Sequence, residues 1–287
     1  MVRYRRSIIE ERAREVNRLQ KVLEGANIKL GSVVSDIDGV ASRRMLEALI
    51  KGETDVSVMA GMAYGKMKDK EEDLKRALKG LVGGHQRMIL ATMLRHIDFL
   101  AGEIKRLDDE IKRRMNPFEE QVAQLDAITG VGERSAQTIL AEIGTDMSAF
   151  PSASHLASWA GMCPGNNESA GKKKSGKTRK GNKTLRSCLV ECAKAASKSK
   201  NSYLSAQYKR IAARRGRNRA AVAVGHSILE IVYNMLKNKT PYEDLGFGYF
   251  DERKKQINIK RYVKRLESMG VFLSLRAGSG SFQDRIG

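Results

Sequence analysis

The sequence predicts a mainly α-helical fold, in which long coiled-coil helices precede a helical domain that carries a helical hairpin and a basic loop. Apolar residues recur at alternating spacings of three and four over 16–30 and 90–111, as in a coiled-coil seam. Gly or Pro follows most helical stretches, where helices usually end. We expect three parts: a helical coiled-coil segment, a helical domain, and a basic helix with a flexible tail, at 1–117, 118–250 and 251–287.

The composition points to a polyanionic partner. The chain has 287 residues, a formal net charge of +20 and 41% hydrophobic residues, too many for a disordered basic tail. A charge excess of this size favours nucleic acid first and an anionic membrane surface second. No apolar run approaches the ~20 residues that span a bilayer, and no N-terminal segment resembles a secretion signal. We therefore expect a soluble intracellular protein that binds nucleic acid and not a membrane.

The three cysteines predict neither a disulfide framework nor a metal site. Cys188 and Cys192 lie four residues apart and could share a metal, but no His or further Cys completes the set. We therefore expect small buried thiols, including Cys163, and no metal ligands in this chain.

The first part of the chain begins with a helix at its N-terminus. The helix ends at Gly31, and its seam consists of Val16, Leu19, Leu23, Ala26 and Leu30. A second helix is predicted over about 38–50, with Val40 on its apolar face and Gly52 at its end.

Two short helices, at 59–64 and 71–81, precede the clearest helix of the sequence. This helix carries its seam over 90–111 and stops before Pro117. So narrow a stripe needs a partner helix. The partner is either residues 6–30 of the same chain, in antiparallel orientation, or the same helix of a second subunit, and the width of the stripe does not distinguish them.

A glycine-centred hairpin opens the second part of the chain. Two short helices flank Gly130-Val131-Gly132, and the glycines allow a tight turn that leaves N–H groups unpaired at the start of the second helix. Such amides bind phosphate without reading bases. The pattern matches the helix-hairpin-helix of many DNA-binding proteins, and the alternative is a plain helical hairpin with a glycine turn.

Further helices are predicted at 185–200, 203–213 and 220–236. The last is apolar almost all round, so we expect it to be the buried centre of this part. His226 lies within it, where a hydrogen-bonded core histidine is commoner than a catalytic base. The C-terminal residues predict a basic helix at 251–269 and a short strand at 271–275. From Ala277 we expect a flexible tail.

Residues 164–186 contain four glycines and no acidic residue after Glu168, so we expect an irregular loop. A segment with this charge density repels itself unless an anion lies in it, and a phosphate backbone fits best. The alternative is a solvated, disordered linker. The cations that we expect to bind nucleic acid are Lys172, Lys173, Lys174, Lys177, Arg179, Lys180, Lys183 and Arg186.

A series of motifs resembles a known family. They are Leu125-Asp-Ala-Ile-Thr-Gly-Val-Gly, Ile139-Leu-Ala-Glu-Ile-Gly, Phe150-Pro-Ser-Ala-Ser-His-Leu-Ala-Ser-Trp-Ala-Gly, Cys163-Pro-Gly-Asn-Asn-Glu-Ser-Ala-Gly-Lys and Thr178-Arg-Lys-Gly-Asn. Together they resemble the C-terminal domain of bacterial insertion-sequence transposases, the bridge-RNA-guided recombinases. Weaker similarity covers nearly the whole chain, and the motif over 164–172 is its specific part.

The resemblance implies an activity and partners. Members of that family combine an N-terminal RuvC-like domain, whose four acidic residues bind divalent metal, with a C-terminal domain that carries a serine nucleophile. Their Ser-small-Gly-Lys step falls on Ser169, which would attack a DNA phosphodiester and form a phosphoserine. The implied partners are DNA, a guide RNA and further copies of the chain through the coiled coil, in the bacterial cytoplasm at the nucleoid.

The sequence also departs from the family, because no acidic quartet and no run of apolar strands precede the first helix. We therefore expect a transposase fragment that binds nucleic acid but is inactive alone, with Mg²⁺ bound only by the missing RuvC-like domain. The alternative function is a non-catalytic helix-hairpin-helix module that binds nucleic acid. A purely structural coiled-coil protein is disfavoured by the charge and glycine placement over 120–250.

Overall fold

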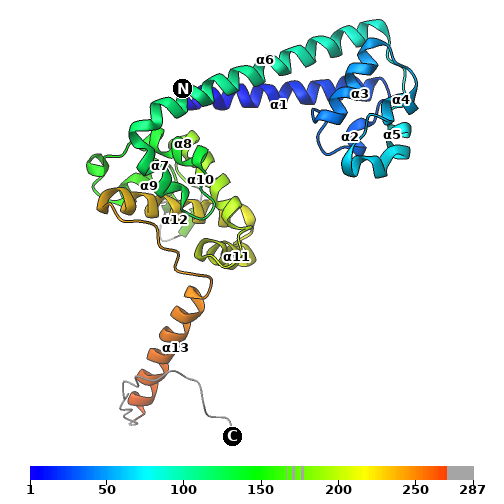
Figure 1. The fold of residues 1–287 in the computed structure, drawn as a ribbon. Coiled ribbons are helices and arrows are strands. Elements are labelled where there is room, and N and C mark those ends of the chain that lie inside the picture. Colours follow the sequence, from blue (N-terminus) through cyan, green and yellow to red (C-terminus); the bar gives the residue numbers. More distant parts are fainter. Residues whose placement is uncertain (166, 170–171, 176–177, 270–287) are drawn as a thin grey trace. The chain divides into compact units, whose positions relative to one another are not determined.

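The computed structural model describes residues 1–165, 167–169, 172–175 and 178–269, with only the backbone at 167–169 and 172–175. The fold is mainly α-helical, as predicted (Figure 1). Contacts divide the chain into unit 1, Met1–Pro117, and unit 2, Phe118–Gly287. Within the described residues, no helix has the length and apolar character needed to cross a bilayer. The strand and tail expected beyond residue 270 lie outside the described residues, and a separate part from residue 251 stays a prediction.

Unit 1 is built from two long helices and several short ones. In chain order these are α1 (Val2–Gly25), α2 (Leu30–Val33), α3 (Val40–Lys51), α4 (Val56–Ala60), the 3₁₀ turn η1 (Gly65–Lys70), α5 (Glu71–Ala77) and α6 (Gly84–Met115). A further 3₁₀ turn, η2 (Asn116–Phe118), follows α6.

The long helices α1 and α6 pack side by side in antiparallel orientation (Figure 1). Arg5 Nη1 near the start of α1 lies 2.7 Å from Asp108 Oδ1 near the end of α6. Glu15 Oε1, further along α1, lies 3.7 Å from His96 Nδ1, earlier in α6. The stripe predicted over 90–111 is therefore covered by α1 of the same chain, so the stripe alone does not require a second subunit.

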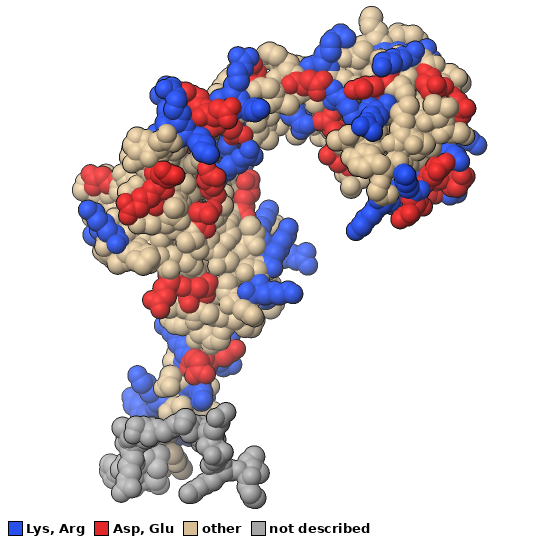
Figure 2. Space-filling model, viewed as in Figure 1, with Lys and Arg blue, Asp and Glu red and all other residues tan. Residues whose placement is uncertain are grey.

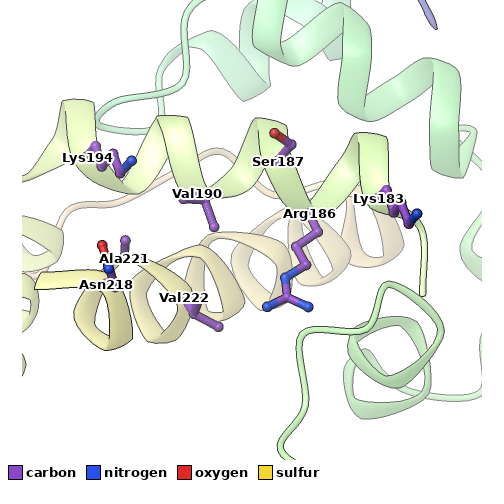
Figure 3. A pocket seen from close by; sticks show the side chains of 8 residues that line it. All are labelled: Lys183, Arg186, Ser187, Val190, Lys194, Asn218, Ala221 and Val222. Carbon is purple, nitrogen blue, oxygen red and sulfur yellow. The ribbon is translucent and has the colours of Figure 1, made fainter. Parts of the chain in front are cut away.

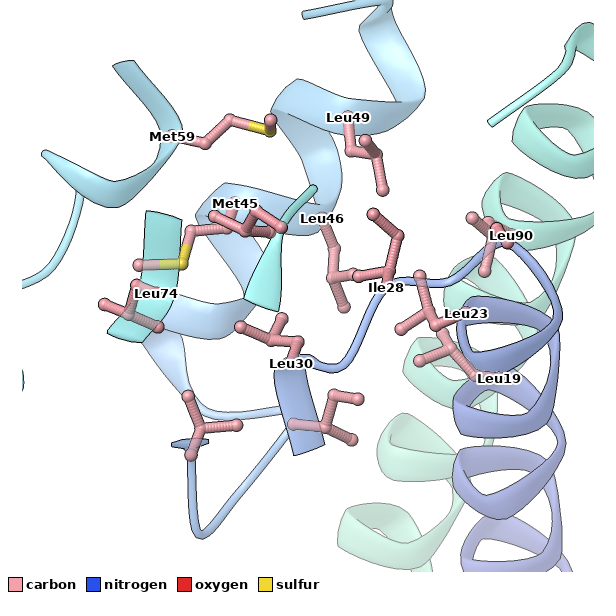
Figure 4. Packing of buried hydrophobic residues seen from close by; sticks show 14 of the residues in the cluster. Leu19, Leu23, Ile28, Leu30, Met45, Leu46, Leu49, Met59, Leu74 and Leu90 are labelled. Carbon is pink, nitrogen blue, oxygen red and sulfur yellow. The ribbon is translucent and has the colours of Figure 1, made fainter. Parts of the chain in front are cut away.

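One apolar core holds the short helices against the ends of α1 and α6 (Figure 4). Its members are at most 7% exposed, and burying a large apolar side chain in this way stabilises the fold by roughly 1.5–3 kcal/mol. The labelled residues are Leu19, Leu23, Ile28, Leu30, Met45, Leu46, Leu49, Met59, Leu74 and Leu90.

The first helix ends earlier than the sequence predicted. It stops at Gly25 instead of Gly31, so Ala26 and Leu30 lie beyond it. Backbone hydrogen bonds to a distant segment replace the helical ones: Lys29 N–H donates to the Ala77 carbonyl at 2.7 Å, and Leu81 N–H donates to the Ala26 carbonyl at 3.1 Å. These tertiary bonds satisfy the peptide groups that a longer helix would have used.

Other predictions for unit 1 differ in detail. Val40 is 59% exposed because it is the first residue of α3 and not part of its buried face. The helices expected at 59–64 and 71–81 are shorter and lie at Val56–Ala60 and Glu71–Ala77. Gly52 ends α3 as predicted, with a left-handed φ of 102°.

Unit 2 contains the remaining helices and one two-stranded antiparallel sheet. They are α7 (Glu119–Asp126), α8 (Glu133–Ile143), the 3₁₀ turn η3 (Met147–Ala149), α9 (Ala153–Trp159), β1 (Asn167–Ser169), β2 (Lys172–Ser175), α10 (Lys183–Ala196), α11 (Tyr203–Arg215), α12 (Arg217–Asn238) and α13 (Tyr249–Ser268).

Helix α12 is the buried centre of unit 2, which confirms the prediction for 220–236. Val224, Ile228, Leu229 and Val232 are completely buried. Helices α9, α10 and α11 all pack against α12, which therefore fixes the positions of the elements that surround the candidate site.

Candidate nucleic-acid interface

The segment predicted to be an irregular loop contains a β-hairpin. Strands β1 and β2 pair with Ser169 opposite Lys172 and Glu168 opposite Lys173, with a register shift next to Asn167. An isolated bridge between Pro164 and Thr178 extends the antiparallel pairing outward. The loop prediction was wrong because it used residue preferences, whereas backbone pairing between strands does not require β-branched side chains.

A close contact between two glycines lies at the base of this hairpin. A Cβ on Gly181 would come within 2.3 Å of the Gly161 nitrogen, and a Cβ on Gly161 would come within 2.9 Å of the Gly181 nitrogen. Gly161 also has a left-handed φ of 70°. The chain therefore enters and leaves the hairpin through two backbones that only glycine allows to approach so closely.

Asn182 continues this base into α10. Its Oδ1 accepts from Leu185 N–H at 3.0 Å and caps the helix, while its Nδ2 donates to Glu142 Oε2 of α8 at 2.5 Å. The hairpin is thus attached to α8 as well as to α10.

His226 of α12 contacts the entry side of the hairpin. Its Nε2 lies 3.9 Å from Cys163 Sγ, and its Nδ1 lies 3.5 Å from Glu230 Oε2. Burial and the nearby Glu230 carboxylate raise the pKa of the Cys163 thiol, so this cysteine stays protonated. The histidine therefore has polar neighbours at both ring nitrogens, as expected, but its side chain is 27% exposed and so it is not a core residue.

The other two cysteines are buried and free, as predicted. A hydrogen bond with the Cys192 thiol, together with burial, raises the pKa of Cys188. Among the described residues, no group of three or more His, Cys, Asp or Glu side chains could hold a metal ion.

An open groove of about 440 Å³ lies between α10 and α12 (Figure 3). Lys183, Arg186 and Lys194 line it from α10, and Figure 3 shows Arg186 extending beside α12. The remaining lining residues are Ser187, Val190, Asn218, Ala221 and Val222. The groove thus offers three cations and several small or polar side chains, but no aromatic ring on which a base could stack.

Few cations of this region are neutralised by carboxylates, and among the described side chains the exception is Arg210, which pairs with Asp251. Between residues 169 and 229 the sequence has 17 Lys and Arg and a single acidic residue, Glu191. Among the described residues, the charged groups of Lys183, Arg186 and Lys194 form neither an ion pair nor a hydrogen bond. Figure 2 shows Lys and Arg side chains gathered on one edge of unit 2. This surface therefore favours a polyanion.

Unit 1 has the opposite arrangement, because many of its exposed cations pair with nearby carboxylates. Arg113 and Arg114 both bind Glu110 at 2.7 Å, and Arg106 binds Glu103. Blue and red side chains accordingly alternate over unit 1 in Figure 2. The unneutralised positive charge is thus concentrated in unit 2.

The glycine turn between α7 and α8 has two roles. Gly130 has a φ of 88°, and a Cβ there would lie 2.5 Å from the Cys192 carbonyl oxygen, so this glycine allows the turn to pack on α10. Gly132 has no atom near its Cβ direction. Within the described residues, the N–H groups of Gly132 and Glu133 have no acceptor, so they are available to an anion.

A carboxylate organises the other side of this turn. Asp244 accepts from Tyr203 and Gly246 N–H at 2.8 Å, from the Tyr242 hydroxyl at 2.9 Å and from the Thr129 hydroxyl at 3.2 Å. Burial opposes the ionisation of Asp244, but the hydrogen bonds outweigh it and lower the pKa of this carboxyl. The turn, the start of α11 and the segment before α13 are therefore joined at one residue.

The structure places the predicted site residues unevenly. Lys183 and Arg186 line the groove, and Arg179 and Lys180, which precede them in the chain, are exposed. Four other predicted residues lie on the hairpin strands, where only the backbone is described: Ser169, Lys172, Lys173 and Lys174. Lys177 lies outside the described residues.

Sequence reasoning missed Lys194 and Asn218, which also line the groove. The spacing from Lys183 to Ser187, Val190 and Lys194 is four, three and four residues, which places all of them on one helix face. That signal was present in the sequence, whereas the approach of Asn218 depends on how α10 and α12 pack.

A comparison with known protein families matches the segment that contains the hairpin and α10. Residues 122–209 match the family described as "Transposase IS116/IS110/IS902 family". The match includes the glycine turn, the hairpin and α10. It supports an insertion-sequence transposase that interacts with DNA in transposition or recombination. A search of curated proteins finds no match.

We predict that Gly181→Ala destabilises unit 2 by about 1–3 kcal/mol, because the added methyl group overlaps the Gly161 backbone. Urea unfolding followed by the fluorescence of Trp159, the single tryptophan, measures the change. The matched control is Gly248→Ala, which has no atom within 4 Å of the new methyl group and should stay within about 0.5 kcal/mol of the wild type. Equal stability of the two variants would contradict the close glycine contact.

We predict that Asp244→Asn lowers the free energy of unfolding by about 0.5–1.5 kcal/mol at pH 7, since charge-assisted hydrogen bonds weaken at a carboxylate that is open to solvent. The folded pKa of Asp244 is lowered, so its contribution is complete above the unfolded pKa, near 4, and disappears as the pH falls through the folded pKa. Unfolding of both proteins between pH 2 and 7 measures this. Asp126→Asn, at an exposed carboxylate, is the control. A difference that does not depend on pH would argue against the Asp244 network.

Proposed function

We propose that this protein is a DNA recombinase in which Ser169 is the nucleophile and the α10–α12 groove holds the DNA backbone. The observation that supports the proposal best is that one transposase-like segment carries both the serine hairpin and a groove with three unneutralised cations. A groove of this kind contacts phosphates without reading the base sequence. The resemblance of the motif over 164–172 supplies the role of Ser169.

The chemistry is a transesterification. The Ser169 oxygen forms a bond to phosphorus, the bond from phosphorus to one sugar oxygen breaks, and that oxygen leaves with a proton. The product is a phosphoserine joined to one DNA end. A sugar hydroxyl of another strand then attacks the phosphoserine and releases the serine. One phosphodiester replaces another, so the exchange consumes no external source of energy.

Two requirements follow from this reaction. Negative charge grows on the phosphoryl oxygens during the attack, and nearby cations stabilise it. Lys172 lies opposite Ser169 in the pairing of β1 with β2, so it is the cation that we propose for this role. The serine hydroxyl must also lose its proton to a base. On the basis of the resemblance, we propose that a Mg²⁺ site in a RuvC-like domain, a guide RNA and further copies of the chain also take part.

A second candidate function is a nucleic-acid-binding module without chemistry of its own. The free amides of Gly132 and Glu133 and the cations of the groove favour it, because both features bind phosphate and neither requires a nucleophile. The two candidates agree on binding and differ only in the role of Ser169.

We predict that replacing the three cations of the groove by glutamine lowers the affinity for DNA and makes that affinity less dependent on salt concentration. If Lys183→Gln, Arg186→Gln and Lys194→Gln together remove three phosphate contacts, the slope of log affinity against log salt should become shallower by about 2.7. Titration of a labelled duplex at several salt concentrations measures this. The control removes three cations that pair with carboxylates, by Arg106→Gln, Arg113→Gln and Arg114→Gln. Equal slopes for the two triple variants would exclude the groove as the binding surface.

We predict that Ser169→Ala lowers the rate of strand transfer by about three orders of magnitude or more. Its affinity for duplex DNA should stay within about twofold of the wild-type value. The assay adds the RuvC-like domain of a family member and also captures the covalent protein–DNA adduct on a denaturing gel. Ser175→Ala, at the other serine of the hairpin strands, is the control. Retained strand transfer in Ser169→Ala would leave only the binding module.

A further inference from the structure

The last described helix, α13, is exposed along its whole length. None of its 20 residues is buried. It is attached to unit 2 at its first turn, where the Phe250 ring stacks on Tyr203 at 5.0 Å and Asp251 pairs with Arg210 at 3.0 Å. A helix fixed at one end and uncovered elsewhere is available to a partner.

Most of the cations of α13 lie on one face, and Lys255 is the exception. At 100° per residue, six cations fall within an arc of about 140°: Arg253, Lys254, Lys260, Arg261, Lys264 and Arg265. The opposite arc carries Ile259, Tyr262, Val263, Leu266 and Met269. Asp251 and Glu252 lie in the first turn and Glu267 in the last. Between Arg253 and Arg265 the arc of the six cations contains one other residue, Ile257, and Phe250 and Ser268 fall in the same arc at the two ends of the helix.

These cations have no neutralising partners. None of the six forms an ion pair among the described side chains, and Arg261 lies over the Tyr262 ring, 5.3 Å from its centroid. On α6, by contrast, exposed arginines pair with glutamates three or four residues away. Six like charges on one face repel one another until a polyanion neutralises them.

We propose that α13 binds double-stranded DNA by placing this basic face in the major groove. The cations from Arg253 to Arg265 extend over about 18 Å at 1.5 Å per residue, which suits several consecutive phosphates. An isolated helix about 10–12 Å in diameter fits the major groove of B-DNA, about 12 Å wide, whereas the deep, narrow major groove of A-form RNA excludes it.

This contact is separate from the α10–α12 groove. Helix α13 lies outside the matched residues 122–209, and its binding requires neither Ser169 nor the groove cations. An anionic membrane is the other surface that a basic amphipathic helix could cover. The apolar arc of α13 argues against it, because Lys255 and Glu252 lie within that arc and no tryptophan is present.

The test uses the full chain with a labelled 30-base-pair DNA duplex. Arg261→Gln, Lys264→Gln and Arg265→Gln together should lower duplex affinity at least about tenfold at 0.1 M salt and make the salt slope shallower by about 2.7. A second comparison uses neighbours on opposite faces: Lys254→Gln should make the slope shallower by about 0.9, and Lys255→Gln should not. Circular dichroism checks that the variants keep their helix content.

Three results would overturn the proposal. The first is a triple variant whose duplex affinity lies within twofold of the wild type. The second is an equal loss of affinity for an RNA duplex of the same length, which would exclude insertion into the major groove. The third is an unchanged DNA affinity together with weaker binding to vesicles that contain 30% phosphatidylserine. The same losses in the background of the groove variant would support two independent DNA contacts.

Discussion

The close approach of the Gly161 and Gly181 backbones is the contact on which the candidate site depends. It brings the two ends of the hairpin together, and the bridge between Pro164 and Thr178 continues the pairing from there. Because Asn182 then caps α10, the position of the hairpin and the position of the groove are set by the same few residues. A side chain at either glycine would separate the strands that carry Ser169 from the helix that carries Arg186.

Charge distribution explains why the two units differ in their surfaces. In unit 1, many arginines pair with carboxylates within helices and across the α1–α6 contact, so charges of both signs are mixed over its surface. In unit 2 the cations of α10 and α13 have no such partners among the described residues. Paired charges gain little by meeting DNA, since each new contact breaks an existing one, whereas unpaired charges release counterions from the backbone.

The sequence predicted the parts of the fold that depend on periodic burial. The seam over 90–111 and the apolar helix around Val224 follow from side-chain spacing, and both were identified. The end of α1 at Gly25 could not be predicted, because it is set by hydrogen bonds to residues 77–81, far away in the sequence. The hairpin was missed for a similar reason: its strands are stabilised by backbone pairing, which composition does not record. Only part of the groove was predicted. Arg186 belongs to a basic run that the sequence shows, whereas Asn218 lies in the groove only because α10 and α12 pack together.

The antiparallel pair of long helices in unit 1 has a consequence for how such chains can change in length. Arg5 contacts Asp108 and Glu15 contacts His96, so each step along α1 has a fixed counterpart on α6. An insertion in one helix alone would move every later contact out of register. Related proteins should therefore lengthen or shorten α1 and α6 together, by whole heptads, so that the contacts between the two helices stay in register.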